Sequence, residues 1–329
     1  MTKLPGGPAP AGGVPGISIS LALRLRSAGL DPVAVAGFVG AALAEDLAGG
    51  SDVTTAATVP AGATGSADLV ARSAGVVAGL PVAAAVFALA PGNRAGSSHD
   101  GAQLDCGDLA ADGDRVAAGQ PVLRVTGLIG PILTAERTAL NLLCHLSGVA
   151  TLTRQWADAV AGTGARIRDT RKTTPGMRAL EKYAVRCGGG VNHRMALSDA
   201  ALIKDNHVAA AGSVAAAFAA VRRRAPGLPL EVECDTLDQV AEALAAGADE
   251  ILLDNFAVAD IAAAVALTGG RARLEASGGL TLATARAVAE TGVDYLAVGA
   301  LTHSAPALDI GLDLAQAGLA IGTPDATDD

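Results

Sequence analysis

The sequence predicts an α/β protein with an incomplete (open) β/α barrel that follows a smaller N-terminal α+β domain. Short apolar segments alternate with Ala-rich helical segments through the second half of the 329-residue chain. Several of these strands begin 21 or 22 residues apart, which is the repeat of parallel βαβ units. Six strands are clear and a full set of eight is not evident, which favours an incomplete or open barrel.

Four segments are expected along the chain. Residues 1–16 are rich in Pro and Gly, which predicts a disordered tail. Residues 17–135 carry a helical pattern followed by short alternating runs, which predicts the α+β domain. Residues 136–310 are expected to form the barrel domain, and residues 311–329 a C-terminal segment that ends in a short acidic tail.

Within the N-terminal domain, the pattern predicts a helix over residues 30–47 and strands over 65–70 and 116–125. One long helical stretch, residues 134–161, is expected to join the two domains. The expected barrel strands are residues 166–170, 200–204, 229–234, 250–254, 272–277 and 294–299.

Composition excludes several classes of partner. The net charge of −9 argues against a protein that binds nucleic acid through its general field. Residues 73–93 are uncharged but are interrupted by Gly and Pro, which favours a buried strand-turn-helix over a membrane span. The N-terminus lacks the apolar region of a signal peptide, and the four scattered cysteines form no CxxC pair. We therefore expect a cytoplasmic protein with reduced thiols.

Functional residues of a β/α barrel lie at the carboxyl ends of its strands. In this sequence two of those ends offer cations, two offer carboxylates and two offer glycine backbone. In chain order they are Arg171 and Lys172, then Lys204, Glu233, Asp254, the loop of Ser277, Gly278 and Gly279, and finally Gly299. Two glycine loops on consecutive late strands are typical of a phosphate site made by backbone N–H groups.

Residues 166–206 hold nine of the 24 Lys and Arg residues, where an even spread would place about three. Arg178, Lys182 and Arg186 are spaced by four residues and are interpreted as a solvated helix face. That interpretation fits poorly for the cations at strand ends or in the loop after three glycines, which are Arg171, Lys172, Arg194 and Lys204. These predict a cationic pocket for a small, multiply anionic, phosphorylated substrate.

Glu233 and Asp254 allow two interpretations. As a structural feature, they neutralise Lys204. As a functional feature, two carboxylates beside bound phosphates hold Mg²⁺, directly or through water, and stabilise a developing positive charge. His193 also has two interpretations, because an isolated histidine is more often structural; its position next to Arg194 favours contact with the substrate.

Several runs carry a family resemblance, among them AERTALNLLCHLSGVAT, DTRKTTPGMRALEKYAVRCGGGVNHRMALSDAALIKDNH, EVECDTLDQ, ILLDNF, SGGL and GVDYLAVGALTHS. They resemble the quinolinate phosphoribosyltransferase (nicotinate-nucleotide pyrophosphorylase) family, and SDVTTAATVPAGATGSADLVARSAGVVAGLPVA resembles its N-terminal domain. The resemblance covers roughly residues 20 to 315. One departure is Ala196, which stands where many members have Gly.

The resemblance implies a pentosyltransferase of NAD synthesis. Quinolinate and 5-phosphoribosyl-1-pyrophosphate would give nicotinate mononucleotide, pyrophosphate and CO₂, with Mg²⁺ as cofactor. It also implies an N-terminal open sandwich and a homodimer, or a hexamer built as a trimer of dimers, with sites between subunits and no nucleic-acid or membrane partner.

The resemblance also implies residue roles. Lys172, Glu233 and Asp254 would be catalytic, and Glu233 and Asp254 would face the ribose and Mg²⁺. Arg137 would be donated across the subunit interface. The implied substrate-binding residues are Arg137, Thr170, Arg171, Lys172, His193, Arg194, Lys204, Glu233, Asp254, Ser277, Gly278, Gly279 and Gly299.

Two alternatives stay open from the sequence. One is a related phosphoribosyltransferase that acts on nicotinate or another aromatic acid. The number of cations distinguishes them, because a monocarboxylate would not need Arg137, Arg171 and Arg194 together. The other is a non-catalytic barrel that binds anions, which would tolerate loss of Glu233 and Asp254.

Overall fold

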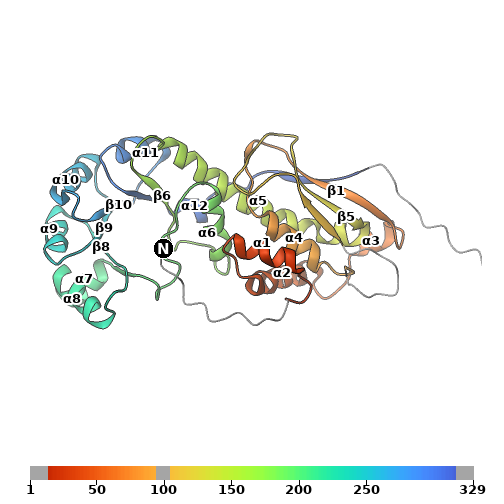
Figure 1. Ribbon diagram of the computed structural model, residues 1–329, viewed down its shortest axis with the longest axis horizontal. Helices are drawn as coiled ribbons and strands as arrows, with labels where there is room; N and C mark the ends of the chain where they lie inside the picture. Colours follow the sequence, from red (N-terminus) through yellow and green to blue (C-terminus); the bar gives the residue numbers. More distant parts are fainter. Residues whose placement is uncertain (1–13, 94–103, 316–329) are drawn as a thin grey trace, which may run out of the picture.

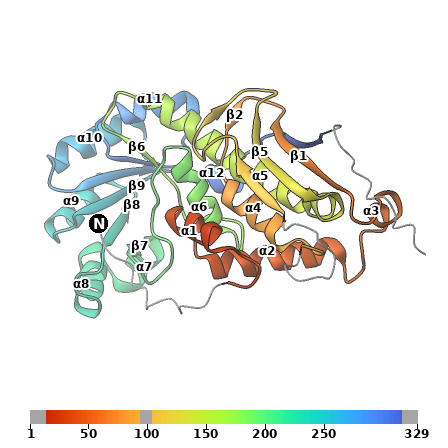
Figure 2. The ribbon, with the colours of Figure 1, turned by 45° about the vertical axis from the view of Figure 1, so that its right-hand side comes forward.

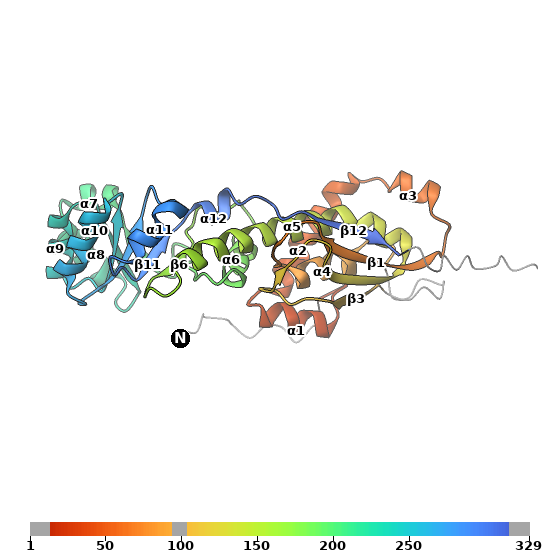
Figure 3. The ribbon, with the colours of Figure 1, turned by 90° about the horizontal axis from the view of Figure 1, so that it is seen from above.

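Two sheets and one long helix organise the molecule (Figure 1). The structure is a computed structural model that describes residues 14–93 and 104–315. A parallel sheet with its helices lies at one end and an antiparallel sheet at the other, and helix α5 (Ile129–Ala159) runs between them (Figures 1 and 3). Most of the expected N-terminal tail and of the expected acidic C-terminal tail lies outside the described residues.

The parallel sheet contains the six strands that the sequence predicted, each within two residues of its expected bounds. Its order is β6-β11-β10-β9-β8-β7, so β6 and β7, which are its first two strands in the chain, stand at opposite edges. This order agrees with an open barrel and confirms the α/β class. The strands are β6 (Arg166–Arg168), β7 (Ala201–Ile203), β8 (Leu230–Cys234), β9 (Glu250–Asp254), β10 (Arg273–Ser277) and β11 (Tyr295–Ala297).

Helices cover the outer face of the parallel sheet (Figure 2). Ser213, Thr236 and Thr281 cap three of them, since each side chain accepts the N–H three residues on. Small and β-branched residues on the inner helix faces, such as Val240 and Ala243 of α9, pack in the core. These helices are α7 (Asp205–Ala211), α8 (Val214–Arg224), α9 (Leu237–Ala245), α10 (Val258–Thr268) and α11 (Leu282–Ala289), whereas the short α12 (Ala300–His303) packs against α5.

The antiparallel sheet has the order β12-β1-β5-β3 and belongs to the N-terminal half except for its last strand. Residues 310–314, expected at the end of the barrel and in the C-terminal segment, instead form strand β12, which pairs with β1. The strands are β1 (Thr64–Ala71), β3 (Asp105–Asp108), β5 (Pro121–Leu128) and β12 (Ile310–Leu314), with a separate pair of β2 (Gly75–Val76) and β4 (Arg115–Val116).

The N-terminal helices are α1 (Ile19–Ser27), α2 (Pro32–Leu47), α3 (Val53–Thr58) and α4 (Leu80–Leu89). Helix α2 matches the predicted helix, whereas α1 and α3 were not predicted. The uncharged stretch of residues 73–93 forms β2 and the deeply buried α4, as the buried strand-turn-helix interpretation expected. In the described residues no single helix is long and apolar enough to span a membrane; α1 and α2 meet that test only together, across a bend of 106°.

Helix α5 packs closely against the returning C-terminal segment. A Cβ built on Gly148 would lie 2.1 Å from the carbonyl oxygen of Pro306 and 2.9 Å from Cα of Ala307. Only glycine allows this approach, which leads the chain from the barrel back to β12. The helix begins five residues before its predicted start at residue 134.

Candidate active site

A cavity of about 410 Å³ opens where the strands of the parallel sheet end. Its position agrees with the carboxyl-end rule for barrels. Most of the predicted site residues meet in it. The cavity is lined by Thr170, Arg171, Lys172, His193, Arg194, Leu202, Lys204, Glu233, Leu252, Asp254, Glu275, Ser277 and Ala297.

One buried carboxylate, Asp169, ties together the two loops that carry the pocket arginines. Asp169 follows β6 and precedes the loop of Arg171, and it is completely buried. Its oxygens accept hydrogen bonds from Lys182 Nζ (2.5 Å), from the backbone N–H of His193 (2.8 Å) and from Asn192 Nδ2 (2.5 Å). The loop after β6 and the loop before Arg194 therefore share one anchor.

The solvated-face interpretation of helix α6 (Arg178–Cys187) is wrong for Lys182. Its side chain is 0% exposed, and its Nζ donates to both Asp169 and the carbonyl oxygen of His193 (2.9 Å). Burial lowers the pKa of Lys182 and raises that of Asp169, while their attraction opposes both shifts. The spacing of four residues does place these cations on one side of the helix, but that side contacts the loops instead of only solvent.

The two flanking arginines of α6 also hold loops. Arg178 donates to the Thr173 hydroxyl and to the carbonyl oxygen of Met195, both at 3.0 Å. Arg186 donates to the side-chain oxygen of Asn192 at 2.7 Å. These contacts make α6 the support of the loop after β6 and of the loop around Arg194.

Glu181, next to Lys182, fixes the far side of the same loop. Its buried carboxylate accepts the backbone N–H of Thr174 at 3.0 Å and lies 3.0 Å from Nε2 of His145 on α5. The loop from Thr170 to Thr174 is thus held at both ends by neighbouring residues of one helix.

Glu233 and Asp254 face the cavity from adjacent strands, β8 and β9. Lys204 Nζ donates to Glu233 Oε2, so the structural pairing considered from the sequence exists. Asp254 Oδ2 accepts from Asn255 Nδ2 at 2.8 Å. Their carboxylate oxygens are the hard donors that Mg²⁺ prefers, so the residues present fit that ion.

Gly278, Gly279, Gly299 and Arg137 do not line the cavity. Gly278 has a φ of +84°, and a Cβ there would lie 2.6 Å from the side-chain carbon Cγ of Asn255, so this glycine allows the loops after β9 and β10 to touch. Gly299 approaches the Lys172 stem, since its Cβ would lie 3.0 Å from Cδ. For these glycines, phosphate binding stays a prediction.

Arg137 lies on α5, and its side chain is 64% exposed, with the nearest carboxylate oxygen at 3.9 Å on Glu136. It does not contribute to the cavity of its own chain. Its predicted donation to a neighbouring subunit stays a prediction.

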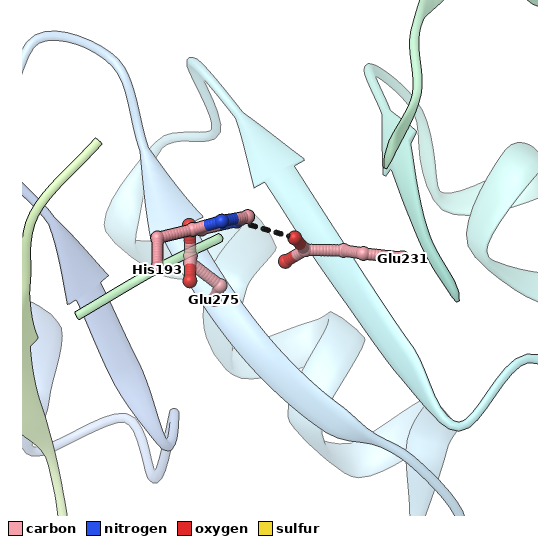
Figure 4. Close-up of side chains that lie close together, drawn as sticks. All are labelled: His193, Glu231 and Glu275. Atoms are coloured by element: carbon pink, nitrogen blue, oxygen red, sulfur yellow. Dashed lines mark hydrogen bonds and ion pairs between the residues drawn. The ribbon is translucent and has the colours of Figure 1, made fainter. Parts of the chain in front are cut away.

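Three charged residues around His193 were missed from the sequence, namely Arg168, Glu231 and Glu275, and so were the apolar cavity residues Leu202, Leu252 and Ala297. Figure 4 shows Glu231 and Glu275 beside His193, and of these three residues His193 and Glu275 line the cavity. Arg168 Nη1 donates to Glu275 Oε2 at 2.6 Å and to Glu250 Oε1 at 2.5 Å. Burial raises the pKa of both Glu231 and Glu275 to about 7. Side-chain alternation could have found them, because Glu231 lies two residues before Glu233 on one strand face.

Family models cover most of the chain. The model described as "Quinolinate phosphoribosyl transferase, N-terminal domain" matches residues 52–147, and the model of the C-terminal domain matches residues 149–313. The chain belongs to the quinolinate phosphoribosyltransferase family. The two models meet inside α5, and the expected domain boundary at residues 135–136 also falls within that helix.

Relatives in this family are close. The chain is 56% identical over 276 residues to the nicotinate-nucleotide pyrophosphorylase (carboxylating) of Mycobacterium leprae, which covers 83% of this chain and 94% of that protein. The solved nicotinate-nucleotide pyrophosphorylase of Francisella tularensis is 37% identical, with a TM-score of 0.79 over 86% of this chain and 96% of that one. Human nicotinic acid phosphoribosyltransferase, 16% identical with a TM-score of 0.53 over 80% of this chain and 74% of that one, shares the fold alone.

Proposed function

We propose that this family member converts quinolinate and 5-phosphoribosyl-1-pyrophosphate into nicotinate mononucleotide, pyrophosphate and CO₂, in de novo NAD synthesis. The observation that carries the proposal is one cavity with Arg171, Lys172 and Arg194 beside Lys204, and with the carboxylates of Glu233 and Asp254 on its wall. A ring with two adjacent carboxylates and a sugar donor with several phosphates repel each other. Clustered cations offset that repulsion and hold the reacting atoms together.

The carboxylates and the cations have separate roles in the proposed reaction. Loss of pyrophosphate leaves positive charge on the ribose carbon, which the negative charge of Glu233 and Asp254 stabilises. Decarboxylation then leaves an electron pair on the ring carbon next to the new cationic nitrogen. The positive charge of that nitrogen stabilises the pair, and the ring carbon then takes up a proton from water to give nicotinate mononucleotide. The protein's part is therefore positioning, with Arg171 and Arg194 on the carboxylates and Lys172 near both substrates.

We further propose Mg²⁺ as cofactor. Glu233 and Asp254 would hold it directly or through water, and it would neutralise charge on the leaving pyrophosphate. Lys204 occupies one oxygen of Glu233 and the Asn255 amide occupies one oxygen of Asp254, so each carboxylate would hold the ion mainly through its other oxygen. We place the reaction in the cytoplasm, in keeping with four free cysteines.

The first test compares two acids. We expect purified protein with 5-phosphoribosyl-1-pyrophosphate and Mg²⁺ to form nicotinate mononucleotide from quinolinate, and to use nicotinate at most weakly. The reason is that the two carboxylates of quinolinate would each pair with an arginine of the cavity. The single carboxylate of nicotinate would leave one of these cations without a partner. Product would be followed by chromatography. Turnover of nicotinate alone would favour the related phosphoribosyltransferase that acts on nicotinate or another aromatic acid.

We propose that the active assembly is a homodimer, or a hexamer made as a trimer of dimers, in which Arg137 enters the partner's cavity. The exposure of its side chain and its absence from the lining of its own chain's cavity support this arrangement. Arg137→Ala and Lys172→Ala subunits should each be nearly inactive alone. Mixed dimers of the two should regain part of the activity, because one of the two sites would then be intact. Failure to recover activity in dimers shown to be mixed would contradict a shared site.

A further inference from the structure

Every polar group of His193 is already bonded within the protein. Its backbone N–H donates to Asp169 at 2.8 Å, and its carbonyl oxygen accepts from Lys182 at 2.9 Å. On the ring, Nδ1 accepts the backbone N–H of Arg194 at 2.7 Å, and Nε2 lies 2.7 Å from Glu231 Oε2. The imidazole therefore turns both nitrogens toward the protein, and Figure 4 shows the contact of Nε2 with Glu231.

These contacts determine the tautomer. A nitrogen that accepts an N–H carries no proton, so Nδ1 is unprotonated and the ring proton lies on Nε2. Nε2–H then donates to Oε2 of Glu231, which accepts whether or not the other oxygen of that carboxyl group carries a proton. Burial lowers the pKa of His193, which also favours the neutral ring.

The groups that face His193 come from several elements. Glu231 lies on β8 and Glu275 on β10, with Glu275 Oε1 at 3.8 Å from Nε2. Arg168 and Lys182 oppose the acids from β6 and α6, and Glu250 adds a further carboxylate from β9. Oε1 of Glu231 and Oε1 of Glu275 are buried without a hydrogen-bond partner among the described residues. Because acids and cations both surround the ring, their net charge does not set its orientation. Glu231 does, since its oxygen is the carboxylate oxygen nearest to Nε2.

Arg194 is the residue that this chain of contacts controls. Its backbone N–H is held by the ring of His193, and its Nη1 donates to the carbonyl oxygen of Ala200 at 3.0 Å. The guanidinium lines the cavity and carries a permanent charge. A change in the ring orientation would break the hydrogen bond to the backbone N–H of Arg194. The direction of the Arg194 side chain would then no longer be fixed.

We propose that Glu231 and His193 are positioning residues that orient Arg194 for the dicarboxylate, and that His193 acts as a neutral linker rather than as a cationic ligand. This inference rests on the proposed function for its substrate. It differs from the role that the resemblance implied, in which His193 itself holds a substrate carboxylate.

Glu231→Leu is the test variant, because it removes the acceptor for Nε2–H at similar size. We expect the KM for quinolinate to rise about tenfold to a hundredfold, the range of one lost hydrogen bond to a charged group. We expect kcat to stay within about threefold of the wild-type value, because Arg194 would bind the carboxylate equally in the ground state and in the transition state. Glu231→Gln keeps an oxygen acceptor and should recover most of the affinity.

The matched control is Glu250→Gln, which alters an acid at the start of β9 that does not line the cavity and that bonds Arg168 and Arg273, not His193. It should leave the KM for quinolinate near the wild-type value. An equal rise in KM in Glu250→Gln, or an unchanged KM in Glu231→Leu, would overturn the proposal.

A spectroscopic readout separates this inference from the activity. In ¹⁵N-histidine NMR, ring 193, assigned by its loss in His193→Gln, should show the neutral Nε2–H tautomer at pH 7 and keep it when quinolinate binds. Glu231→Leu should give a mixture of tautomers. A doubly protonated ring in the quinolinate complex would overturn the neutral role. If wild-type protein did not use quinolinate, the proposed function would fail while the tautomer in the free protein still reported on the Glu231 contact.

Discussion

Lys182→Met lowers the free energy of unfolding by about 3–5 kcal/mol, the range for removing one partner of a buried ion pair. The loss is large because Asp169 would keep its charge in a fully buried position, with only neutral donors left around it. Methionine fills most of the lysine stem's volume, so the effect reports on charge rather than on a cavity. Urea unfolding followed by circular dichroism measures the difference.

The control for Lys182 lies on the same helix. Arg186→Met removes a cation one turn away that is exposed and bonds Asn192 and a backbone carbonyl of Ala28. We expect it to cost about 1 kcal/mol. Asp169→Asn combined with Lys182→Met should be less destabilised than the sum of the single changes, because the two residues interact directly. Equal stability of Lys182→Met and wild type would contradict the role of this pair as an anchor.

Glu233→Gln and Asp254→Asn should each lower kcat by about a hundredfold to a thousandfold, the range for loss of one group that stabilises charge in a transition state. Both changes keep the side-chain shape and remove the negative charge from the cavity wall. The Kd for quinolinate, measured by calorimetry, should change little, because its contacts are with the arginines.

Asp235→Asn is the control for these two variants. Asp235 lies two residues beyond Glu233 but does not line the cavity, so its charge is removed from the same strand end without touching the site. We expect its kcat to stay near the wild-type value. Unchanged turnover in both Glu233→Gln and Asp254→Asn would support a non-catalytic barrel that binds anions.

The regular part of the fold could be predicted from sequence because it depends on local pattern. Six apolar segments at a constant repeat are sufficient to predict a parallel sheet. The side chains at the ends of those strands can then be expected at one edge of the sheet, as is found for Arg171, Lys204, Glu233 and Asp254. Strand β12 could not be predicted in the same way. Its partner β1 lies more than 200 residues earlier in the chain, and nothing local in residues 310–314 indicates it.

The interior of the site was harder to predict, because a charged residue in a sequence gives no sign of its burial. Lys182 has the spacing of a surface helix residue and is completely buried, since Asp169 and a carbonyl compensate its charge. Glu231 and Glu275 were overlooked because they sit one step below the strand ends, where core residues are normally apolar. The bonded state of both ring nitrogens of His193 is a tertiary property with no local pattern.

The central claim is that this cavity removes a carboxyl group while it joins quinolinate to the sugar. The most direct measurement uses quinolinate labelled with ¹⁴C in the 2-carboxyl group, together with 5-phosphoribosyl-1-pyrophosphate and Mg²⁺. The account predicts one labelled CO₂ released for each nicotinate mononucleotide formed, and no label in the nucleotide. A labelled nucleotide, or nucleotide formed without labelled CO₂, would contradict it.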